Sequence, residues 1–515
     1  MRATPIGHAG ILVETRGQSI LCDPWFVPAF FASWFVFPRN DQLPADLLER
    51  IEHPTYLYIS HLHGDHLDEA WLSEHVSRDT TVLVPGYPTR ELERRLRHLG
   101  FVNFVRTKNG EPTDLGDGLQ VVIHVETSIT DGPGGDSALV VSDGEHVLVN
   151  QNDCRTTDLG ALSRYGRVDL HFLQHSGAIW YPMVYDETPE RMHELAAAKV
   201  ESQLTRAMRY VEAIDARAVV PSAGPPCFLD AELFGLNVIT GDEASIFPDQ
   251  RAFLERLAQA GRNGVLNIPG TTIDVTDGAI TVTHPLPDTD VAAIFDDKGA
   301  YLRRYQADWD AWIAAQRRTW VPERPDLLER LTSWWEPLME LAPNLRAAIG
   351  AGILLRAGDL DVYLDMPAGT VRAWNGEPYR YRFEIARELV ETVAAEEAVD
   401  WSNALFLSCR FRAWREGPFN EYVYNFFKSL SSERMKRAEA EAARKLDPPD
   451  NDEEIELCGY VMERYCPHRQ ADLSAFGEVE DGLLTCTLHG WQFDLATGEC
   501  LTATDRSLRV RRAGS

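Results

Sequence analysis

Short apolar runs alternate with helical periodicity over the first 295 residues of the chain. The runs 10–15, 56–60 and 119–125 are rich in valine, isoleucine and other strand formers, which predicts β-strands. A stretch with apolar residues at helical spacing and few helix breakers extends from about residue 190 to residue 213. This alternation predicts a layered α/β domain over residues 1–295, with its functional site beyond the ends of the strands.

The pattern changes between residues 296 and 445. A helical stretch rich in tryptophan, arginine and leucine runs from Trp309 to Trp335, and an alternating segment over 360–374 ends in the turn dipeptide Asn375-Gly376. We therefore predict a small α+β domain over residues 296–445. Its Arg- and Trp-rich segments could bind a substrate, but their composition favours packing, for example in a homodimer interface.

Length, charge and cysteine content limit the classes of function. A chain of 515 residues is too long for one hydrophobic core. Its net charge of −29 argues against nucleic acid or an anionic membrane as a partner, although a local basic pocket could still bind an anionic substrate. We find no apolar run of about 18 residues, as a membrane span would need, and no signal-peptide pattern. Eight cysteines, mostly without paired spacing, are typical of a reducing cytoplasm, where we expect the protein.

Two cysteine-histidine pairs lie near the C-terminus, in Cys466-Pro467-His468 and Cys486-Thr487-Leu488-His489. A Rieske [2Fe–2S] cluster is bound by two cysteine thiolates on one iron and two histidine imidazoles on the other. A structural zinc site uses the same residue types, but zinc-finger spacings pair cysteine with cysteine and histidine with histidine. The interleaved order therefore predicts a Rieske cluster bound by Cys466, His468, Cys486 and His489.

A segment rich in proline and aspartate, 447–452, precedes these pairs and has the composition of a linker. It marks the boundary of a third domain, residues 446–515. The stretch Gly490–Asp494 is similar to the sequence that follows the second histidine in Rieske proteins. We therefore expect a small all-β Rieske domain here.

Four further ligand-type side chains lie in the six-residue segment His61-Leu62-His63-Gly64-Asp65-His66. The predicted strand 56–60 leads directly into it. His61 and His63 project the same way from an extended backbone, whereas Asp65 and His66 turn toward a second position, so the segment could bind two metal ions. It resembles the first metal motif of the metallo-β-lactamase superfamily, and the resemblance extends over roughly residues 4–235. The resemblance implies an αββα sandwich for the first domain.

The resemblance to this superfamily also implies ligands from later strands. Asp153 occupies the place of the acid that bridges the two metals. Glu126 occupies the place of the third ligand of the first metal, for which His124 and Asp136 are competitors. His175 is the candidate for the last ligand of the second metal, unless it is a buried core histidine. A carboxylate at the third-ligand place, where most members have histidine, favours iron over zinc.

Within the superfamily, the chain resembles the CMP-N-acetylneuraminate hydroxylase family, which combines a Rieske centre with a metallo-β-lactamase-like domain. Matching stretches include His8–Gly10, Asp23–Phe26, Asn150–Cys154 and 220–224. In that family the Rieske motif precedes the catalytic domain, whereas here it follows, and the family has no counterpart of His175. The resemblance therefore implies the combination of domains and not the sialic-acid substrate.

The resemblance implies a Rieske-dependent monooxygenase, an oxidoreductase that hydroxylates a small molecule, such as a nucleotide sugar or a natural-product intermediate, with O2. Two non-haem iron ions would be bound by the residues of the metal motifs, His61, His63 and Glu126 on one iron, Asp65, His66 and His175 on the other, and Asp153 between them. The three carboxylates of this set are the candidate catalytic residues. No Gly-rich dinucleotide fingerprint follows an early strand, so we expect an external ferredoxin, cytochrome or reductase as electron donor.

Two other functions fit the same motifs. A zinc hydrolase could carry the Rieske domain as a redox sensor, with Asp65 orienting a zinc-bound hydroxide. A diiron O2 or NO reductase would need no organic substrate. Metal content distinguishes the hydrolase from the oxygenase, because the oxygenase needs about four irons per chain and the hydrolase about two irons and two zincs.

Overall fold

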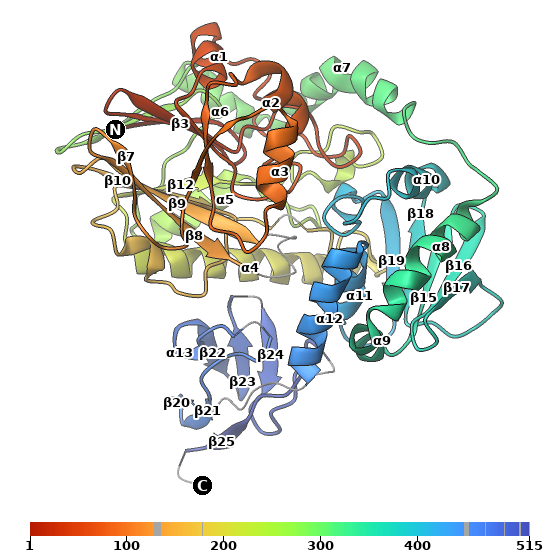
Figure 1. The fold of residues 1–515 in the computed structure, drawn as a ribbon. Helices are drawn as coiled ribbons and strands as arrows, with labels where there is room; N and C mark the ends of the chain where they lie inside the picture. The colour runs from red at the N-terminus through yellow and green to blue at the C-terminus, as the bar shows by residue number, and fades with distance from the viewer. Residues whose placement is uncertain are drawn as a thin grey trace. The chain divides into compact units, whose positions relative to one another are not determined.

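The computed structural model describes residues 1–127, 135–177, 179–446, 453–468, 470–488, 490–503 and 506–513, and Figure 1 labels its helices and strands. The chain divides into two units. The first consists of Met1–Met183 and Thr188–Arg318, and the second of Val184–Glu187 and Thr319–Ser515. Within the described ranges, no helix is both long enough and apolar enough to cross a membrane.

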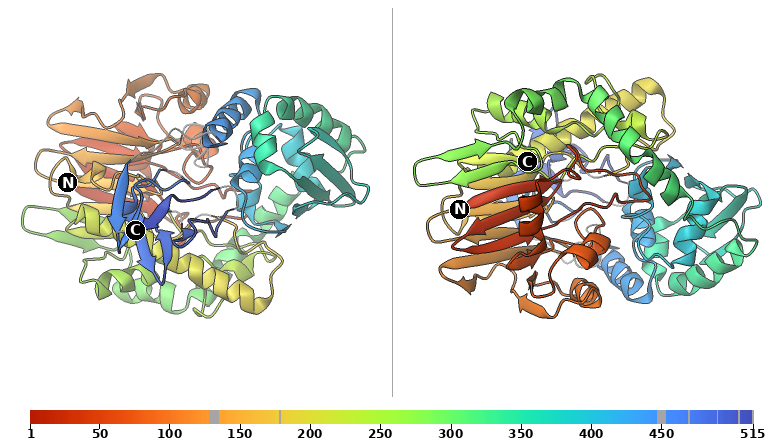
Figure 2. Two further views of the ribbon diagram at one scale, coloured as in Figure 1. Left: turned by 90° about the horizontal axis from the view of Figure 1, so that it is seen from below. Right: turned by 90° about the horizontal axis from the view of Figure 1, so that it is seen from above.

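Two β-sheets form the centre of the first unit (Figure 2). The eight-stranded sheet has the order β14-β13-β1-β2-β3-β4-β5-β6, and the six-stranded sheet has the order β12-β11-β10-β9-β8-β7. The strands of the larger sheet are β1 Arg2–Gly7, β2 Gly10–Thr15, β3 Gln18–Cys22, β4 Tyr56–Tyr58, β5 Thr81–Val84, β6 Asn103–Arg106, β13 Thr272–Val275 and β14 Ile280–Thr283. Those of the smaller sheet are β7 Thr113–Gly116, β8 Leu119–Glu126, β9 Asp136–Ser142, β10 Val147–Asn152, β11 Leu170–Gln174 and β12 Ala218–Ser222.

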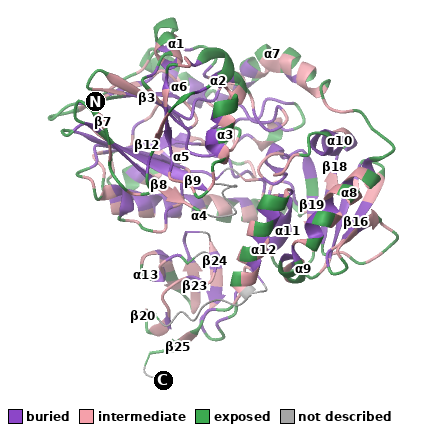
Figure 3. Ribbon diagram, in the orientation of Figure 1, coloured by how far each residue is buried: buried purple, intermediate pink, exposed green. Residues whose placement is uncertain are grey.

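The alternation of side chains explains why these strands are continuous apolar runs. In β2, Ile11 and Val13 belong to the apolar cluster between the two sheets, whereas Leu12 belongs to the cluster beneath the outer helices. Ile20 and Leu21 of β3 divide in the same way. Successive side chains of a strand point to opposite faces, so a strand that is covered on both faces needs apolar residues throughout. Figure 3 shows these strands as largely buried.

Helices cover both sheets, which confirms the predicted αββα sandwich. Leu47, Trp71 and Leu92 of the first three helices pack in the cluster on the larger sheet. Two later helices, α4 and α5, contact β11 and β12 of the smaller sheet. The helices of this unit are α1 Ala45–Glu52, α2 Glu69–His75, α3 Glu91–His98, α4 Pro189–Ile214, α5 Gln250–Gln259, α6 Asp288–Asp296 and α7 Lys298–Arg317, with short 3-10 helices at Ala161–Ser163 and Phe234–Leu236.

The first unit continues beyond residue 295, through α7 to Arg318. Trp309 and Trp312 of α7 pack against Phe35, which is buried in the same unit. The indole N–H of Trp309 donates to Asp41 Oδ2 at 2.9 Å. The beginning of the Trp-rich stretch therefore packs within this unit.

The second unit begins with a mixed α and β region built on a five-stranded sheet of order β17-β16-β15-β18-β19. Its core is aromatic, because Trp335 is fully buried and lies 5.1 Å from Trp401 and 6.0 Å from Phe427 between ring centroids. The strands are β15 Gly352–Ala357, β16 Leu360–Asp365, β17 Thr370–Ala373, β18 Tyr381–Ile385 and β19 Phe411–Arg415. The helices are α8 Leu327–Glu340, α9 Pro343–Ile349, α10 Arg387–Ala395, α11 Glu421–Phe427 and α12 Ser432–Leu446, with a 3-10 helix at Phe406–Ser408.

The C-terminal part of the second unit contains two three-stranded sheets, of order β20-β21-β25 and β22-β23-β24. Its elements are β20 Glu454–Leu457, β21 Tyr460–Glu463, α13 Leu473–Phe476, β22 Gly477–Glu480, β23 Leu483–Cys486, β24 Trp491–Asp494 and β25 Val510–Arg512. The last strand pairs with β21, so the two ends of this region meet in one sheet. The predicted linker over 447–452 lies outside the described residues.

Candidate metal centres

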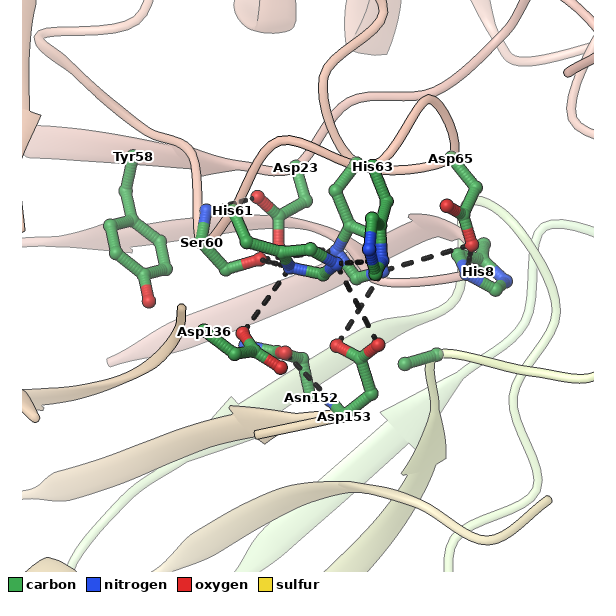
Figure 4. Close-up of polar contacts among 12 residues, drawn as sticks. His8, Asp23, Tyr58, Ser60, His61, His63, Asp65, Asp136, Asn152 and Asp153 are labelled. Atoms are coloured by element: carbon green, nitrogen blue, oxygen red, sulfur yellow. Dashed lines mark hydrogen bonds and ion pairs between the residues drawn. The ribbon is translucent and has the colours of Figure 1, made fainter. Parts of the chain in front are cut away.

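The His-rich segment follows β4, as the sequence predicts, and its side chains point toward the ends of strands of the smaller sheet (Figure 4). Two groups of ligand-type side chains form there, and within each group the ligand atoms lie within 4.8 Å of one another. The groups are His61, His63 and Asp153, and His8, Asp65 and His66. The structure thus brings together five of the seven residues predicted to bind the two metals.

Asp153 faces both groups. Its Oδ2 lies 3.8 Å from His61 Nε2, and its Oδ1 lies 3.6 Å from His66 Nε2. Nε2 of His61 also lies 2.8 Å from Nδ1 of His63, so these two nitrogens are directed toward the same point in the site. A carboxylate with one oxygen toward each group has the arrangement expected of a bridge in a two-metal site.

His8 is a candidate ligand that the sequence reasoning missed. It lies in the turn between β1 and β2 with a φ of 51°, and its Nε2 is 3.0 Å from Asp65 Oδ2. This left-handed conformation is uncommon for a residue other than glycine and tends to occur at functional sites. The backbone N–H of Ala223 donates to the His8 carbonyl at 3.0 Å, which ties the turn to the segment after β12. The match of His8–Gly10 to the hydroxylase family is the signal that could have found it.

Glu126 and His175 belong to neither group. Glu126 ends β8 and is paired in register with Asp136 of β9. His175 follows β11, is buried, and stacks on Phe253 of α5 with 5.5 Å between ring centroids. Burial lowers the pKa of His175 to about 4, so its ring is neutral at pH 7. The ligand roles of both residues stay predictions.

The two competitors of Glu126 have different surroundings. Asp136 Oδ1 lies 3.2 Å from Nδ1 of His61, whereas Nε2 of His124 lies 3.2 Å from the hydroxyl oxygen of Tyr165. Asp136 therefore contacts the ring nitrogen of His61 that does not face Asp153. A carboxylate that contacts the ring nitrogen facing away from the metal fixes the orientation of a ligand imidazole.

Two further side chains orient the histidine rings. Ser60 Oγ lies 2.9 Å from Nδ1 of His61 and 3.1 Å from Nδ1 of His66. Asp23 accepts the backbone N–H of Ser60 at 2.7 Å, and its second oxygen lies 3.1 Å from Nδ1 of His66. Because both Nδ1 atoms are engaged, the Nε2 atoms of His61 and His66 are the ones left for metal ions.

Four side-chain atoms of the two groups are buried and have no hydrogen-bond partner within the described ranges, namely Nε2 of His63, Nε2 of His66, Oδ1 of Asp65 and Oδ1 of Asp153. A buried polar atom that makes no hydrogen bond costs free energy. Metal ions would satisfy at least Nε2 of His66 and Oδ1 of Asp153, which lie 3.6 Å apart and face each other. The described residues therefore fit a dinuclear metal site.

The ionisation of Asp65, Asp153 and His63 also suits metal binding. Although burial opposes it, the charge of His66 and the hydrogen bond with His8 hold the pKa of Asp65 far below its usual range. For Asp153 as well, desolvation opposes ionisation, yet His66 and His61 lower its pKa. Burial and the neighbouring His61 lower the pKa of His63 to about 3, so this imidazole is neutral at pH 7. Ionised carboxylates and a neutral imidazole are the forms in which these groups bind metals.

Replacing Asp23 by asparagine is expected to weaken metal binding at this site roughly 10- to 100-fold, the usual effect of losing an outer-shell partner. Asparagine keeps the shape of the side chain but removes the charge that faces Nδ1 of His66. Retention of iron during dialysis against a chelator measures the effect. Asp46→Asn, at a side chain that is 78% exposed, is the matched control. Equal retention by the Asp23 variant and the unaltered protein would contradict this role.

The predicted Rieske ligands lie on two loops of the second unit, and three of them are described, whereas His489 lies outside the described residues. Cys466 follows β21, Cys486 ends β23, and both thiols are fully buried. The ring of His468 is also buried and stacks on Trp491 with 4.0 Å between ring centroids. This contact brings the first loop against the residue that begins β24. Two buried thiols and an imidazole are donors that a [2Fe–2S] cluster uses, so these residues fit it.

A buried carboxylate outside the Rieske motif contacts its histidine. Oε2 of Glu421, the first residue of α11, lies 3.6 Å from Nε2 of His468. Lys445 lies 3.2 Å from Oε1 of Glu421, and Arg506 forms an ion pair with the same carboxylate. Although burial opposes it, the hydrogen bond with His468 and the charge of Lys445 hold the pKa of Glu421 far below its usual range. Glu421 faces Nε2 of His468, which leaves Nδ1 as the nitrogen for the cluster. No sequence pattern indicated this residue.

Comparison with protein families identifies three regions. Residues 18–222 match the Beta-lactamase superfamily domain, residues 327–444 match the Rv3818-like, SCP2-like domain, and residues 450–510 match the Rieske [2Fe-2S] domain. These matches confirm the predicted metallo-β-lactamase and Rieske domains. The Rieske match also supports a [2Fe–2S] cluster as a cofactor. The SCP2-like match describes the middle region, for which the sequence reasoning predicted only an α+β class.

Solved structures match about half of the chain at low similarity. The metallo hydrolase Igni18 of Ignicoccus hospitalis is 17% identical, with a TM-score of 0.37 and coverage of 53% of this chain and 99% of that one. The diiron β-hydroxylase CmlA of Streptomyces venezuelae is 18% identical, with a TM-score of 0.36 and coverage of 53% and 54%. At these TM-scores neither match adds to the assignment.

Relatives with similar sequences include proteins of the same length. The cytidine monophosphate-N-acetylneuraminic acid hydroxylase of Pan troglodytes is 27% identical over 233 residues, which cover 44% of this chain and 38% of that protein. A Rieske 2Fe-2S iron-sulfur protein of Mycolicibacterium smegmatis is 45% identical over 526 residues, covering 99% of this chain and 100% of the relative. Its counterpart in Mycobacterium tuberculosis, Rv3818, is 45% identical over 522 residues with the same coverage. The chain therefore belongs to the family of these mycobacterial Rieske 2Fe-2S iron-sulfur proteins.

Proposed function

We propose that this protein is a Rieske-dependent monooxygenase, which hydroxylates a small organic substrate with O2 at a dinuclear non-haem iron site. The observation that carries the proposal is the position of Asp153, whose two oxygens face two groups of buried ligand atoms. A chain that combines such a site with a Rieske domain suits chemistry that consumes electrons. Hydrolysis consumes none.

The ligands suit iron. Each group combines two imidazoles with one carboxylate, His61 and His63 with Asp153, and His8 and His66 with Asp65. Non-haem iron accepts both kinds of ligand, whereas imidazole alone is equally suited to zinc. Glu126 stays our candidate for a further carboxylate on the first iron, and His175 for a further ligand on the second. An added carboxylate would favour iron over zinc.

The relative from Pan troglodytes supports hydroxylation as the type of reaction. Its name describes a hydroxylase, and the similarity extends over 233 residues. The domain of this chain that contains the predicted dinuclear site belongs to the superfamily that we inferred from the motifs. The substrate named for that relative is not carried over.

The residues of the chain hold the site in position. When bound, two iron ions would supply the chemistry of O2, and the [2Fe–2S] cluster would supply electrons one at a time. Asp153 lies between the two ligand groups and turns one oxygen toward each. Asp23 and Ser60 fix the orientation of the rings of His61 and His66. Burial of these rings keeps bulk water away from the ligand atoms. For the electrons we propose an external ferredoxin, cytochrome or reductase.

Metal analysis and isotope labelling test the proposal. Iron-loaded, full-length protein is expected to contain about four irons per chain, two in the cluster and two at the dinuclear site. Incubation with a small-molecule extract, a chemical reductant and 18O2 is expected to yield a product that carries one labelled oxygen atom. About two irons with two zincs, and an unlabelled product, would support a hydrolase instead. Consumption of O2 or NO without a labelled organic product would support a diiron reductase.

A further inference from the structure

Three cationic side chains of the first unit gather between α4 and the loop that carries Asp153. Arg155 lies on the loop that leaves β10, two positions after the bridging residue Asp153. Lys199 and Arg206 lie on α4. Arg155 acts electrostatically on both of them, so the three positive charges are close in space.

One face of α4 is turned toward this loop. Lys199, Gln203, Arg206 and Tyr210 are spaced four, three and four positions apart, which places them on the same face of a helix. The hydroxyl of Tyr210 donates to the backbone carbonyl of Thr156 at 2.7 Å. This bond holds the face against the segment that carries Arg155 and Asp153.

The cations have no counter-charge in the described part of the chain. There, no carboxylate forms an ion pair with Arg155, Lys199 or Arg206, although Arg206 is only 6% exposed. Burial and the charges of Arg155 and Arg206 lower the pKa of Lys199 to about 7, and burial and Arg155 lower the pKa of Arg206 to about 9. Burying Arg206 beside two other cations, with no ion-paired acid among the described residues, is unfavourable for folding, and proteins keep such groups where function needs them.

Gln203 is an independent sign that a ligand belongs here. It is buried, and among the described residues neither its amide nitrogen nor its amide oxygen has a hydrogen-bond partner. The amide lies against Gly177, where an added Cβ would come within 2.3 Å of Gln203 Nε2. Gln203, which lies beside the cations on the same helix face, therefore offers a ligand one donor and one acceptor. Because Gly177 has no side chain, it leaves room for the Gln203 amide.

We propose that Arg155, Lys199 and Arg206, together with the amide of Gln203, bind a phosphate group of the substrate. This inference rests on the proposed function, because it names the substrate class of the same site. A phosphate group near Arg155 would leave the rest of the substrate close to Asp153 and the metals. The substrate would then be a phosphorylated small molecule, even though the protein as a whole is strongly acidic.

Phosphate fits this set of side chains better than a carboxylate does. A phosphate monoester carries about −1.5 to −2 charges at pH 7 and three strong acceptor oxygens. A carboxylate offers one charge and two oxygens, which would leave more of the three cations uncompensated. Two arginines can each bind a phosphate with two parallel N–H donors, and lysine adds a point charge.

The test uses iron-loaded, full-length protein and measures its thermal unfolding midpoint with rising inorganic phosphate. Chloride at matched ionic strength corrects for screening. Phosphate is expected to raise the midpoint, because a ligand that binds the folded state stabilises it. Arg206→Gln is expected to lose roughly 10- to 100-fold in phosphate affinity, the usual effect of removing a charged hydrogen-bond partner. Arg191→Gln, at an exposed arginine of the same helix, is expected to keep it.

The unfolding midpoint of each variant without phosphate shows whether a loss of phosphate affinity comes from the site alone or from a less stable fold. Because Arg206 is a buried cation without an ion-paired carboxylate among the described residues, Arg206→Gln is expected to unfold at the same temperature as the unaltered protein or higher when phosphate is absent. Phosphate that binds the metals alone would stabilise Arg206→Gln as much as the unaltered protein, which would overturn the proposal. An absence of stabilisation beyond that of chloride, or tighter binding of acetate than of phosphate, would also overturn it. Phenyl phosphate and diphenyl phosphate then distinguish a monoester from a diester site.

This binding measurement needs neither O2 nor an electron donor. A failure of the 18O2 experiment with intact phosphate binding would contradict the oxygenase and leave the phosphate site in place. A labelled product without phosphate binding would leave the oxygenase and contradict the phosphate site.

Discussion

The Asp153→Ala variant is expected to lose iron from the dinuclear site and all turnover that depends on it. The two oxygens of Asp153 face the two ligand groups, so its removal takes a ligand from each metal. Removing an outer-shell partner lowers metal affinity roughly 10- to 100-fold, so removing a bridging ligand is expected to lower it further. Iron analysis after gel filtration measures the loss, and the visible spectrum of the Rieske cluster is recorded on the same sample.

Asp158→Ala is the matched control for this variant. Asp158 lies a few positions along the same loop, its side chain is 52% exposed, and it pairs with Arg164 rather than with the metal groups. It is expected to keep about four irons per chain. An intact Rieske spectrum in the Asp153 variant would show that the loss of iron is local and does not come from unfolding. Retention of both additional irons would refute the bridging role of Asp153.

The Cys486→Ser variant is expected to lose the [2Fe–2S] cluster and turnover with an external electron donor. Cys486 is fully buried at the end of β23, and the cluster is held by cysteine thiolates that serine does not replace. All residues of the dinuclear site belong to the first unit, so their metals are expected to remain. Iron should fall from about four to about two per chain, and the electron paramagnetic resonance signal of the reduced cluster should disappear.

Cys458→Ser provides the control within the same domain. Cys458 is exposed and lies in the turn between β20 and β21, so its replacement is expected to leave the cluster intact. A cluster signal that survived Cys486→Ser would mean that this thiol is not a ligand. Loss of the signal with undiminished hydroxylation by the same donor would instead disprove the proposed path of electrons.

The parts that could be predicted from the sequence are local in the chain. His61, His63, Asp65 and His66 lie within six residues after one strand, and the alternation along an extended backbone already divides them between two positions. The Rieske residues likewise lie in two short loops with a specific interleaved spacing. Apolar runs predicted the strands of a layered α/β domain, and the family matches confirm the resulting fold.

Strand order accounts for the contacts that the sequence could not predict. β1, β3 and β4 run in the same direction in one sheet, so His8, Asp23 and His61, each of which follows one of these strands, reach the same edge. Nothing in the spacing of these residues along the chain indicates that they meet. Glu126 ends one strand of the smaller sheet and His175 follows another, yet they lie in neither ligand group.

The sequence by itself determined the motifs, the elements that carry them and the class of each domain, because these depend on residues that are neighbours in the chain. The tertiary structure alone decided that His8 lies beside Asp65, that Asp136 supports His61, and that Glu421 faces the Rieske histidine. It also decided that Arg155 lies close to Lys199 and Arg206 on one face of α4, with no ion pair to a carboxylate among the described residues. Such contacts join residues that are distant in sequence, and the register and order of strands and the rotation of helices determine them.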